Sequence, residues 1–414
     1  MHKTEIQHLT FHGDKSISHR LLLLSLLTDK KLIISNLPES KDVNTSLSII
    51  KQLGVKIERN GNRISLSGGL TDRKFNEEIV LDCGNSGTTA RLLCGILCNF
   101  KGKFKLIGDE SLSKRPMDRV VKPLRDLAGI HIQSIDGHLP VFLESNGKTQ
   151  PIDFFNETGS AQVKSAILFA GFKNNEKNKV IENIPSRDHT EILLDYLSEQ
   201  KSDEVHFNIP GDISSAAYFA VLAAVMKQEI KIKKLLLNPT RTGFFRVLRR
   251  MGVEIEEKIT DNLWESVGDV RIKGNNLTST NINKEEIPSL IDELPILAIA
   301  MAFSKGTSKV SGAQELRVKE SDRINGLISQ LKKVGINCVE KNDGFEITGP
   351  NHIISAELDS FNDHRLAMSF AVLEYCSKAK FKIKGRNSVN ISFPDFYEKL
   401  NIFTKSDCGS ITGF

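Results

Sequence analysis

One arrangement of apolar and polar positions recurs along the chain: a helical stretch ends at a glycine, and a short alternating strand follows. Four segments show it, at 53–57, 128–132, 251–255 and 334–336. The glycine in each copy stands where a helix C-terminus adopts positive φ, and the residues after it alternate with the period of a half-buried strand. The pattern therefore predicts repeated units of helix, glycine and strand.

Tight turns extend three of these units. The Asn-Gly or Asp-Gly pairs at 60–61, 136–137 and 343–344 separate alternating segments and predict β-hairpins. The first two repeat glycines, at 54 and 129, lie 75 residues apart, so each copy has room for further strands and helices. We therefore predict an α/β fold built from repeated supersecondary modules.

The start of the chain and its middle also share a pattern. GDKSIS at 13–18 and GDISS at 211–215 each open an apolar helix. A chain of 414 residues exceeds what one ordinary core holds. We expect two similar domains with a hinge near residues 209–211.

Composition narrows the class of protein. The net charge is only +5 and both signs are mixed along the chain, which argues against a nucleic-acid-binding protein. Apolar runs such as 21–27, with Ser25 inside it, are far shorter than the ~20 residues that cross a membrane, and the first twenty residues lack a signal-peptide pattern. We expect a cytoplasmic protein with no membrane partner.

The cysteines form no CxxC pair and have no zinc-ligand spacing, so we interpret them as free thiols and expect no metal: Cys83, Cys94, Cys98, Cys338, Cys376 and Cys408.

Several predicted helices begin with small or polar caps, then a basic residue, then an apolar run. They start at 15–20, 84–91, 159–164, 186–191 and 362–365. A helix N-terminus attracts anions, and Arg or Lys beside it suits phosphate or carboxylate. Any one of these is typical of an ordinary N-cap. Five together favour a shared anionic pocket, which we expect between the domains.

Two carboxylates are candidates for proton transfer. Asp292 precedes the apolar helix 296–303, and its spacing alone favours a plain N-cap. Glu320 lies in a charge run that is usually a solvated face, but Lys319 and Arg323 are four residues apart and would share a helix face beside it. A carboxylate flanked by cations suits proton transfer next to an anionic substrate.

Motifs of other enzyme classes are absent from the sequence. The chain lacks the P-loop lysine spacing, GxGxxG after a strand, GxSxG and HExxH. ATP, dinucleotide and zinc-hydrolase chemistry therefore have little support.

The combination of motifs resembles the 5-enolpyruvylshikimate-3-phosphate (EPSP) synthase family over essentially the full length. The matching segments are GDKSISHR (13–20), GNSGTTAR (84–91), KRPM (114–117), GSAQVKSA (159–166), SRDHTE (186–191), GDISSAAYF (211–219), IDELPILA (291–298), ELRVKESDR (315–323) and NDHR (362–365). The resemblance implies an inside-out α/β barrel fold of two similar domains, each of three βαβαββ repeats. Residues 14–210 would form the first domain, and 1–13 with 211–414 the second, with the active site in the cleft between them.

The resemblance also implies an activity. Members transfer the enolpyruvyl group of phosphoenolpyruvate to the 5-hydroxyl of shikimate 3-phosphate by addition and elimination, and phosphate leaves. This reaction belongs to the shikimate pathway, which leads to chorismate and the aromatic amino acids. It implies two small-molecule substrates, no cofactor and no metal, and we expect a monomer.

Site residues are carried over from the family motifs. Those implied to contact shikimate 3-phosphate are Lys15, Ser16, Arg20, Ser160, Ala161, Gln162, Ser186, Arg187 and Lys319. Those implied to face phosphoenolpyruvate are Lys15, Asn85, Gly87, Arg115, Arg323 and Arg365. Asp292 would take the proton of the 5-hydroxyl, Glu320 would handle the methylene proton, and Lys15 would act with them in catalysis.

The chain departs from the family pattern at one substrate position. The family often has a lysine before a Ser-Phe-Pro segment near the C-terminus, where this chain has Ile391. Features shared with members described as insensitive to glyphosate are Gly13-Asp14-Lys15, Ser160-Ala161-Gln162 with Lys164, Arg187 with His189 and Glu191, and Asn238 with Thr240-Arg241. We expect weak inhibition by glyphosate.

Two alternatives stay open. The sibling UDP-N-acetylglucosamine enolpyruvyl transferase shares the reaction type, but many members carry a cysteine in the loop that corresponds to 111–116, which has none here. A non-catalytic, anion- or RNA-binding relative would lose the acid–base pair, whereas Asp292 and Glu320 are both present.

Overall fold

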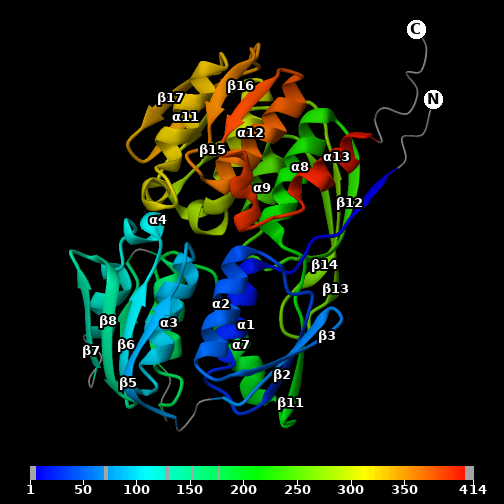
Figure 1. Cartoon of the computed structure of the whole chain (residues 1–414). Helices are drawn as coiled ribbons and strands as arrows, with labels where there is room; N and C mark the ends of the chain where they lie inside the picture. The colour runs from blue at the N-terminus through cyan, green and yellow to red at the C-terminus, as the bar shows by residue number, and fades with distance from the viewer. Residues whose placement is uncertain are drawn as a thin grey trace. The chain divides into compact units, whose positions relative to one another are not determined.

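The computed structural model describes residues 6–69, 73–125, 130–151, 153–157, 159–174 and 178–405. These residues form two compact units (Figure 1). The N-terminal unit comprises residues 12–210 and 263–265. The C-terminal unit comprises 6–11, 211–262 and 266–405.

The described residues of the N-terminal unit form three sheets. The first has the order β11-β2-β4-β3, with β11 (Glu204–Asn208) parallel to β2 (Lys31–Ser35) and the other pairs, with β4 (Arg63–Ser67) and β3 (Lys56–Asn60), antiparallel. The second, β5-β6-β8-β7, repeats that pattern with β5 (Lys74–Asp82), β6 (Lys101–Ile107), β8 (His138–Asn146) and β7 (Ile130–Ile135). The third is the parallel pair β9 (Asp153–Phe155) and β10 (Lys179–Ile181).

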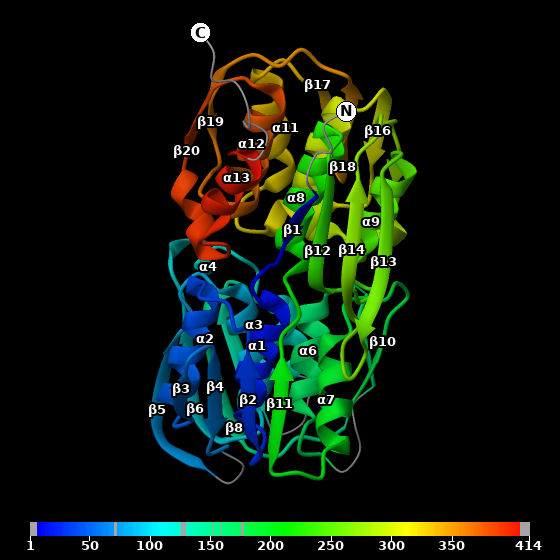
Figure 2. The same ribbon diagram turned by 90° about the vertical axis from the view of Figure 1, so that its right-hand side faces the viewer.

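The C-terminal unit repeats this arrangement. Its first sheet, β1-β12-β14-β13, joins β1 (Gln7–Leu9) in parallel to β12 (Glu229–Leu236), and β12, β14 (Val267–Lys273) and β13 (Glu254–Asp261) lie side by side in Figure 2. The second, β15-β16-β18-β17, contains β15 (Asn281–Ile282), β16 (Gly306–Val310), β18 (Gly344–Gly349) and β17 (Asn337–Lys341). The third is the parallel pair β19 (Ala356–Asp359) and β20 (Phe381–Lys384).

Helices connect these strands. Those of the N-terminal unit are α1 (Lys15–Leu24), α2 (Lys41–Gln52), α3 (Gly87–Leu97), α4 (Glu110–Ser113), α5 (Asp118–Arg125), α6 (Ala161–Ala170) and α7 (His189–Glu199). Those of the C-terminal unit are α8 (Ile213–Met226), α9 (Gly243–Arg250), η1 (Lys284–Ser289), η2 (Ile291–Glu293), α10 (Leu294–Phe303), η3 (Gln314–Val318), α11 (Arg323–Lys333), α12 (His364–Ser377), η4 (Arg386–Ile391) and α13 (Phe396–Lys405).

Burial explains why helices form the inside of each unit and sheets its outer side. In α10, every residue from Leu294 to Ala302 is buried, which is typical of a helix that is apolar on all sides and packed all round. Strand β6, in contrast, alternates between exposed and buried positions, as in a sheet with one solvated face. The predicted α/β fold of two similar, repetitive halves is confirmed. The third copy in each half is shorter, because its sheet has two strands instead of four.

The repeat glycines occur where the sequence predicts them. Gly54, Gly252 and Gly335 have φ of 99°, 100° and 86° and separate helices α2, α9 and α11 from strands β3, β13 and β17. Gly129 lies outside the described residues. The predicted hairpins are the pairs β3–β4, β7–β8 and β17–β18, so local turn chemistry identified them correctly.

The turn between β13 and β14 belongs to the N-terminal unit although its flanking strands do not. Trp264 packs edge-on against Phe207 with ring centroids 5.4 Å apart. The Glu265 carboxylate lies 2.5 Å from Nδ1 of His189, and both side chains are fully buried. These contacts anchor residues 263–265 to β11 and to the start of α7.

No helix among the described residues is long and apolar enough to cross a membrane. Within the same part of the chain, Cys83, Cys94, Cys98, Cys338 and Cys376 are free thiols; Cys408 lies outside it.

Candidate active site

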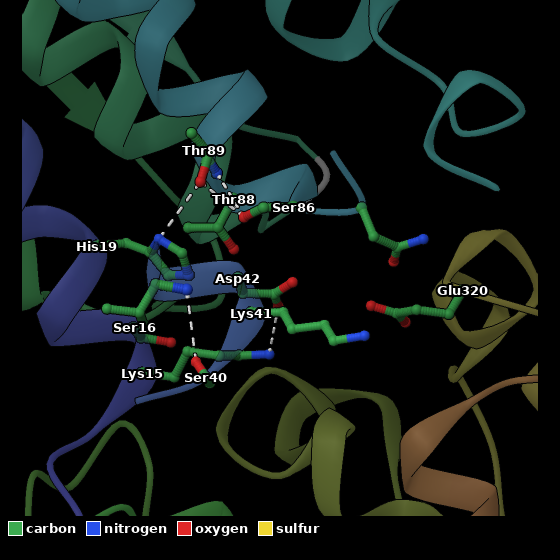
Figure 3. Close-up of polar contacts among 12 residues, drawn as sticks. Lys15, Ser16, His19, Ser40, Lys41, Asp42, Ser86, Thr88, Thr89 and Glu320 are labelled. Carbon is green, nitrogen blue, oxygen red and sulfur yellow. Dashed lines mark hydrogen bonds and ion pairs between the residues drawn. The ribbon is translucent and has the colours of Figure 1, made fainter. Parts of the chain in front are cut away.

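The start of α1 presents a lysine next to an acid. Asp14 caps the helix by accepting a hydrogen bond from the Ile17 amide at 3.0 Å. Lys15 is the next residue, and its Nζ lies 3.0 Å from Oδ2 of Asp42 in α2 (Figure 3). The cap fixes where the helix begins, so the position of the Lys15 backbone is set by local sequence.

Arg20 joins three helices. Its side chain is buried, and it donates to the Thr190 hydroxyl at 2.9 Å, the Ser165 hydroxyl at 2.8 Å and the Ser16 carbonyl at 2.9 Å. These bonds tie α1 to α6 and α7. The contact with shikimate 3-phosphate implied for Arg20 stays a prediction.

His19 belongs to the polar interior of this unit. Its Nδ1 lies 2.8 Å from the Ser46 hydroxyl. It also lies 3.4 Å from the Thr89 hydroxyl, which donates to Ser86, the N-cap of α3 (Figure 3). Burial, with Lys15 and Arg20 nearby, lowers the pKa of His19 well below its ordinary value. His19 is therefore a neutral side chain that links α1 to α2 and to the start of α3.

Three residues predicted to face phosphoenolpyruvate lie together at the start of α3. Arg115 is buried and donates to Oδ1 of Asn85 at 2.7 Å and to the Asn85 carbonyl at 3.3 Å. A Cβ on Gly87 would lie 2.8 Å from a guanidinium nitrogen of Arg91. Glycine at this position therefore allows Arg91 to approach the backbone closely.

The start of α6 contacts the start of α3. Arg91 donates to Oε1 of Gln162 at 2.9 Å, and Nε2 of Gln162 donates to the Thr88 hydroxyl at 3.0 Å. Ser160 is the N-cap of α6, and Ala161 is its first residue. The predicted Ser160-Ala161-Gln162 segment is thus held next to the Asn85–Gly87 segment.

The segment before α7 contacts the start of α1. Arg187 donates to the Ser16 hydroxyl at 3.3 Å. Ser186 donates through its amide and hydroxyl to Glu182 at 3.0 and 2.6 Å. The N-terminal unit therefore brings together the starts of α1, α3, α6 and α7, whereas the fifth helix start named from sequence, at 362–365, belongs to the C-terminal unit. The shared anionic pocket stays a prediction.

The C-terminal unit gathers a second cluster around Arg323. The Arg323 side chain is 1% exposed; its Nε donates to Asp363 at 2.7 Å, it also bonds Glu320, and NH1 lies 3.6 Å from Asp292. Arg365 donates from NH1 to the Asp292 carbonyl at 2.8 Å, and its NH2 lies 3.6 Å from the Asp292 carboxylate. Two predicted arginines and both predicted acid–base carboxylates therefore meet.

Electrostatics keep these arginines charged. Burial alone would lower the pKa values of Arg323 and Arg365, but the neighbouring carboxylates, Asp363 for Arg323 and Asp292 for Arg365 above all, raise them overall. Lys319 behaves in the opposite way, since desolvation lowers its pKa and Asp292 offsets only part of the shift. The cluster thus combines permanent cations with carboxylates.

Two local predictions for this cluster are wrong. Lys319 and Arg323 do not share a helix face, because Lys319 follows η3 in extended conformation and α11 begins only at Arg323, after the N-cap Asp322. Asp292 is not the N-cap of α10, because that position is Glu293 and Asp292 lies in the short helix η2. Both errors arise where a 3-10 turn precedes an α-helix.

Sequence reasoning missed several supporting residues. Asp363 accepts bonds from Arg323 and Ser321 and caps α12 through the Arg365 amide. Glu182 organises Ser186. The NDHR motif could have indicated Asp363, whereas no periodicity or motif indicated Glu182. In the described part of the chain, no group of three or more His, Cys, Asp or Glu side chains is placed to hold a metal ion.

Solved structures resemble the whole fold. An EPSP synthase from Acinetobacter baumannii superimposes with a TM-score of 0.81 at 34% identity, and the match covers 95% of each chain. The enolpyruvyl transferase NikO from Streptomyces tendae has a TM-score of 0.74 over 96% of this chain and 94% of that one. At 13% identity, this second match shows the fold alone.

Sequence comparisons agree over nearly the full length. A 3-phosphoshikimate 1-carboxyvinyltransferase of Sulfurihydrogenibium sp. (strain YO3AOP1) is 41% identical, with 95% of this chain and 96% of the relative covered. The enzyme of the same name from Leuconostoc citreum (strain KM20) is 38% identical over 95% and 96%. The family model described as EPSP synthase (3-phosphoshikimate 1-carboxyvinyltransferase) matches residues 5–400. The chain therefore belongs to the EPSP synthase family.

Proposed function

We propose that this chain transfers the enolpyruvyl group of phosphoenolpyruvate to the 5-hydroxyl of shikimate 3-phosphate, giving 5-enolpyruvylshikimate 3-phosphate and phosphate in the shikimate pathway. The main support for this reaction is the full-length similarity to 3-phosphoshikimate 1-carboxyvinyltransferases. The two polar clusters supply the binding and acid–base groups that such a reaction needs.

The C-terminal cluster supports a proton-transfer role. Asp292 takes the proton of the 5-hydroxyl while that oxygen attacks the enol carbon of phosphoenolpyruvate. Glu320 gives a proton to the methylene carbon, which produces a tetrahedral intermediate. Loss of phosphate and return of a methyl proton to the enzyme then restore the double bond. General acid–base groups typically contribute about 10²- to 10⁴-fold to the rate of such steps.

The arginines support a binding role. Arg323 and Arg365 keep their charge, and a guanidinium group suits recognition of carboxylate or phosphate. Both are held by carboxylates, so the protein fixes them before substrate arrives. We assign them, with Arg115, Asn85 and Gly87, to phosphoenolpyruvate.

The N-terminal cluster supports recognition of a phosphorylated hydroxy acid. Hydroxyl, amide and cationic groups meet at its helix starts, and these suit a ring with hydroxyls and a phosphate. We assign the sugar phosphate to Lys15, Ser16, Arg20, Ser160, Ala161, Gln162, Ser186 and Arg187, with Lys319 of the C-terminal unit. Lys15 also serves phosphoenolpyruvate and acts with Asp292 and Glu320 in catalysis.

The alternatives from sequence gain no specific support. The curated relatives named above carry the shikimate acceptor in their names, which favours it over a UDP-amino sugar. A monomeric state, a cytoplasmic location and the absence of a nucleic-acid partner stay predictions.

Phosphate release tests the proposal. The protein is incubated with phosphoenolpyruvate and either shikimate 3-phosphate or UDP-N-acetylglucosamine. Release only with shikimate 3-phosphate is expected. Release only with the sugar nucleotide would assign the sibling activity, and no release with either acceptor would contradict both.

A further inference from the structure

Glu182 accepts four hydrogen bonds with one buried carboxylate. It follows strand β10, and its side chain is 8% exposed. Oε1 accepts from the Ser186 hydroxyl and from Nδ2 of Asn156, both at 2.6 Å. Oε2 accepts from the Ser186 amide and from Nζ of Lys164, both at 3.0 Å. Both oxygens are thus engaged by the protein.

These bonds join the two segments that carry proposed substrate ligands. Ser186 precedes α7, and Glu182 engages both its amide and its hydroxyl. Asn156 follows β9 and also donates to the carbonyl of Ser160, the N-cap of α6, at 3.2 Å. One carboxylate therefore sets the position of Ser186 directly and that of Ser160 through Asn156.

Lys164 balances the charge of this carboxylate. Its ammonium group, 5% exposed, also lies 2.8 Å from Glu191 in α7 and donates to the Ser186 carbonyl at 3.2 Å. Burial alone would raise the pKa of Glu182, but the bonds from Ser186 and the charge of Lys164 lower it overall. The carboxylate stays ionised and directed at protein donors, so it is not itself suited to contact a phosphorylated substrate.

We propose that Glu182 is a positioning residue for shikimate 3-phosphate, which fixes Ser186 and the Ser160 segment in the arrangement that binds it. The inference rests on the proposed function. Glu182 acts through these serines and touches neither the reacting carbon atoms nor the protons in transfer. Loss of its charge should therefore weaken binding of the sugar phosphate while leaving phosphoenolpyruvate binding and the chemical step nearly unchanged.

Glu182→Gln is the direct test, because the side chain keeps its size but one acceptor becomes a donor that faces other donors. We expect KM for shikimate 3-phosphate to rise roughly tenfold to a hundredfold, as is typical for loss of a hydrogen bond to a charged group. We expect kcat and KM for phosphoenolpyruvate to stay within about threefold, because the lost bond positions groups assigned to shikimate 3-phosphate alone.

Two further variants separate positioning from general damage. Glu191→Gln is the matched control, because Glu191 pairs with the same lysine at 2.8 Å but is 34% exposed; its KM for shikimate 3-phosphate should stay near that of the wild type. Glu182→Asp keeps the charge and should recover part of the lost affinity. Thermal melting of each variant shows whether it is folded, and Glu182→Asp replaces Glu182→Gln if the latter does not fold.

The outcomes distinguish this inference from the proposed function. Turnover of the wild type with shikimate 3-phosphate tests the function, and the ratio between variant and wild type tests Glu182. Calorimetric titration of shikimate 3-phosphate into the wild type and Glu182→Gln gives the same ratio without turnover. An unchanged affinity for shikimate 3-phosphate overturns the positioning role, and so does a fall in kcat matched by equal rises in both KM values. Failure of the wild type to bind the sugar phosphate overturns it as well.

Discussion

Both units bring several helix starts together, but the side chains at those starts differ between the two units. In the N-terminal unit, Arg20 donates to two hydroxyls and a carbonyl. In the C-terminal unit, Arg323 contacts the three carboxylates of Asp292, Glu320 and Asp363. A repeated backbone therefore presents two polar clusters of different composition, and we propose substrate recognition for the first and proton transfer for the second.

Exposure of the carboxylates sharpens this difference. Asp363 is fully buried and serves the arginines, whereas Asp292 and Glu320 are 14% and 23% exposed. A general acid or base must reach the proton that it moves. All three carboxylates thus contact arginines, but Asp363 is enclosed by the protein, whereas Asp292 and Glu320 keep an exposed edge.

The largest effect is expected at Asp292. Asp292→Asn keeps the size of the side chain but removes its basicity, so kcat should fall about 10²- to 10⁴-fold. The melting temperature should fall as well, because the buried Arg365 loses its main carboxylate partner. Steady-state turnover and thermal melting check both parts, with Glu340→Gln, an ion-paired and 30% exposed residue of β17, as the control. Near-normal turnover of Asp292→Asn would place the base elsewhere.

A substitution at Lys15 tests the N-terminal cluster, here called the recognition cluster, which lies at the starts of α1, α3, α6 and α7. Lys15→Met keeps the apolar stem but removes the ammonium group that lies 3.0 Å from Asp42. KM for both substrates should rise roughly tenfold to a hundredfold, and kcat should also fall. This expected pattern differs from that of Asp292→Asn, for which the predicted change is a fall in kcat. Equal KM values for wild type and variant would remove Lys15 from the binding site.

Replacing Lys319 should weaken substrate binding without reducing the stability of the folded protein. Its lowered pKa means that the folded state disfavours the ammonium at neutral pH. That cost is present below the folded-state pKa and disappears above the unfolded value. Lys319→Met should therefore weaken binding of shikimate 3-phosphate without lowering the melting temperature at pH 7. Thermal melting and a calorimetric titration check the two parts, and a destabilised variant would contradict the desolvation argument.

The smallest effect is expected for glyphosate. The features shared with insensitive members, including Ala161 and Arg187 in the recognition cluster, predict weak inhibition. Inhibition of phosphate release at increasing phosphoenolpyruvate measures it. A low-micromolar inhibition constant competitive with phosphoenolpyruvate would contradict the prediction.

Local chemistry predicted much of the fold. Gly54, Gly252 and Gly335 have the positive φ that their positions after helices require, and the hairpins follow Asn-Gly or Asp-Gly turns. These features depend on a few adjacent residues, so a single sequence contains the signal.

The site was predictable only where motifs identify its residues. The bond from Arg20 to Thr190 spans 170 positions, and the bond from Asn156 to Glu182 spans 26. Such pairs depend on tertiary packing, which periodicity does not encode. The error at Lys319 has a local origin instead, because the Asp322 cap starts α11 only at Arg323, after Lys319.

Glu320 provides the most direct test of the division between recognition and proton transfer. Phosphate release from phosphoenolpyruvate and shikimate 3-phosphate is measured for the wild type and Glu320→Gln, alongside calorimetric binding of the sugar phosphate. The account predicts release by the wild type, a loss of about a hundredfold or more in the variant, and similar binding in both. Near-normal release by Glu320→Gln would contradict the assignment of proton transfer to this cluster.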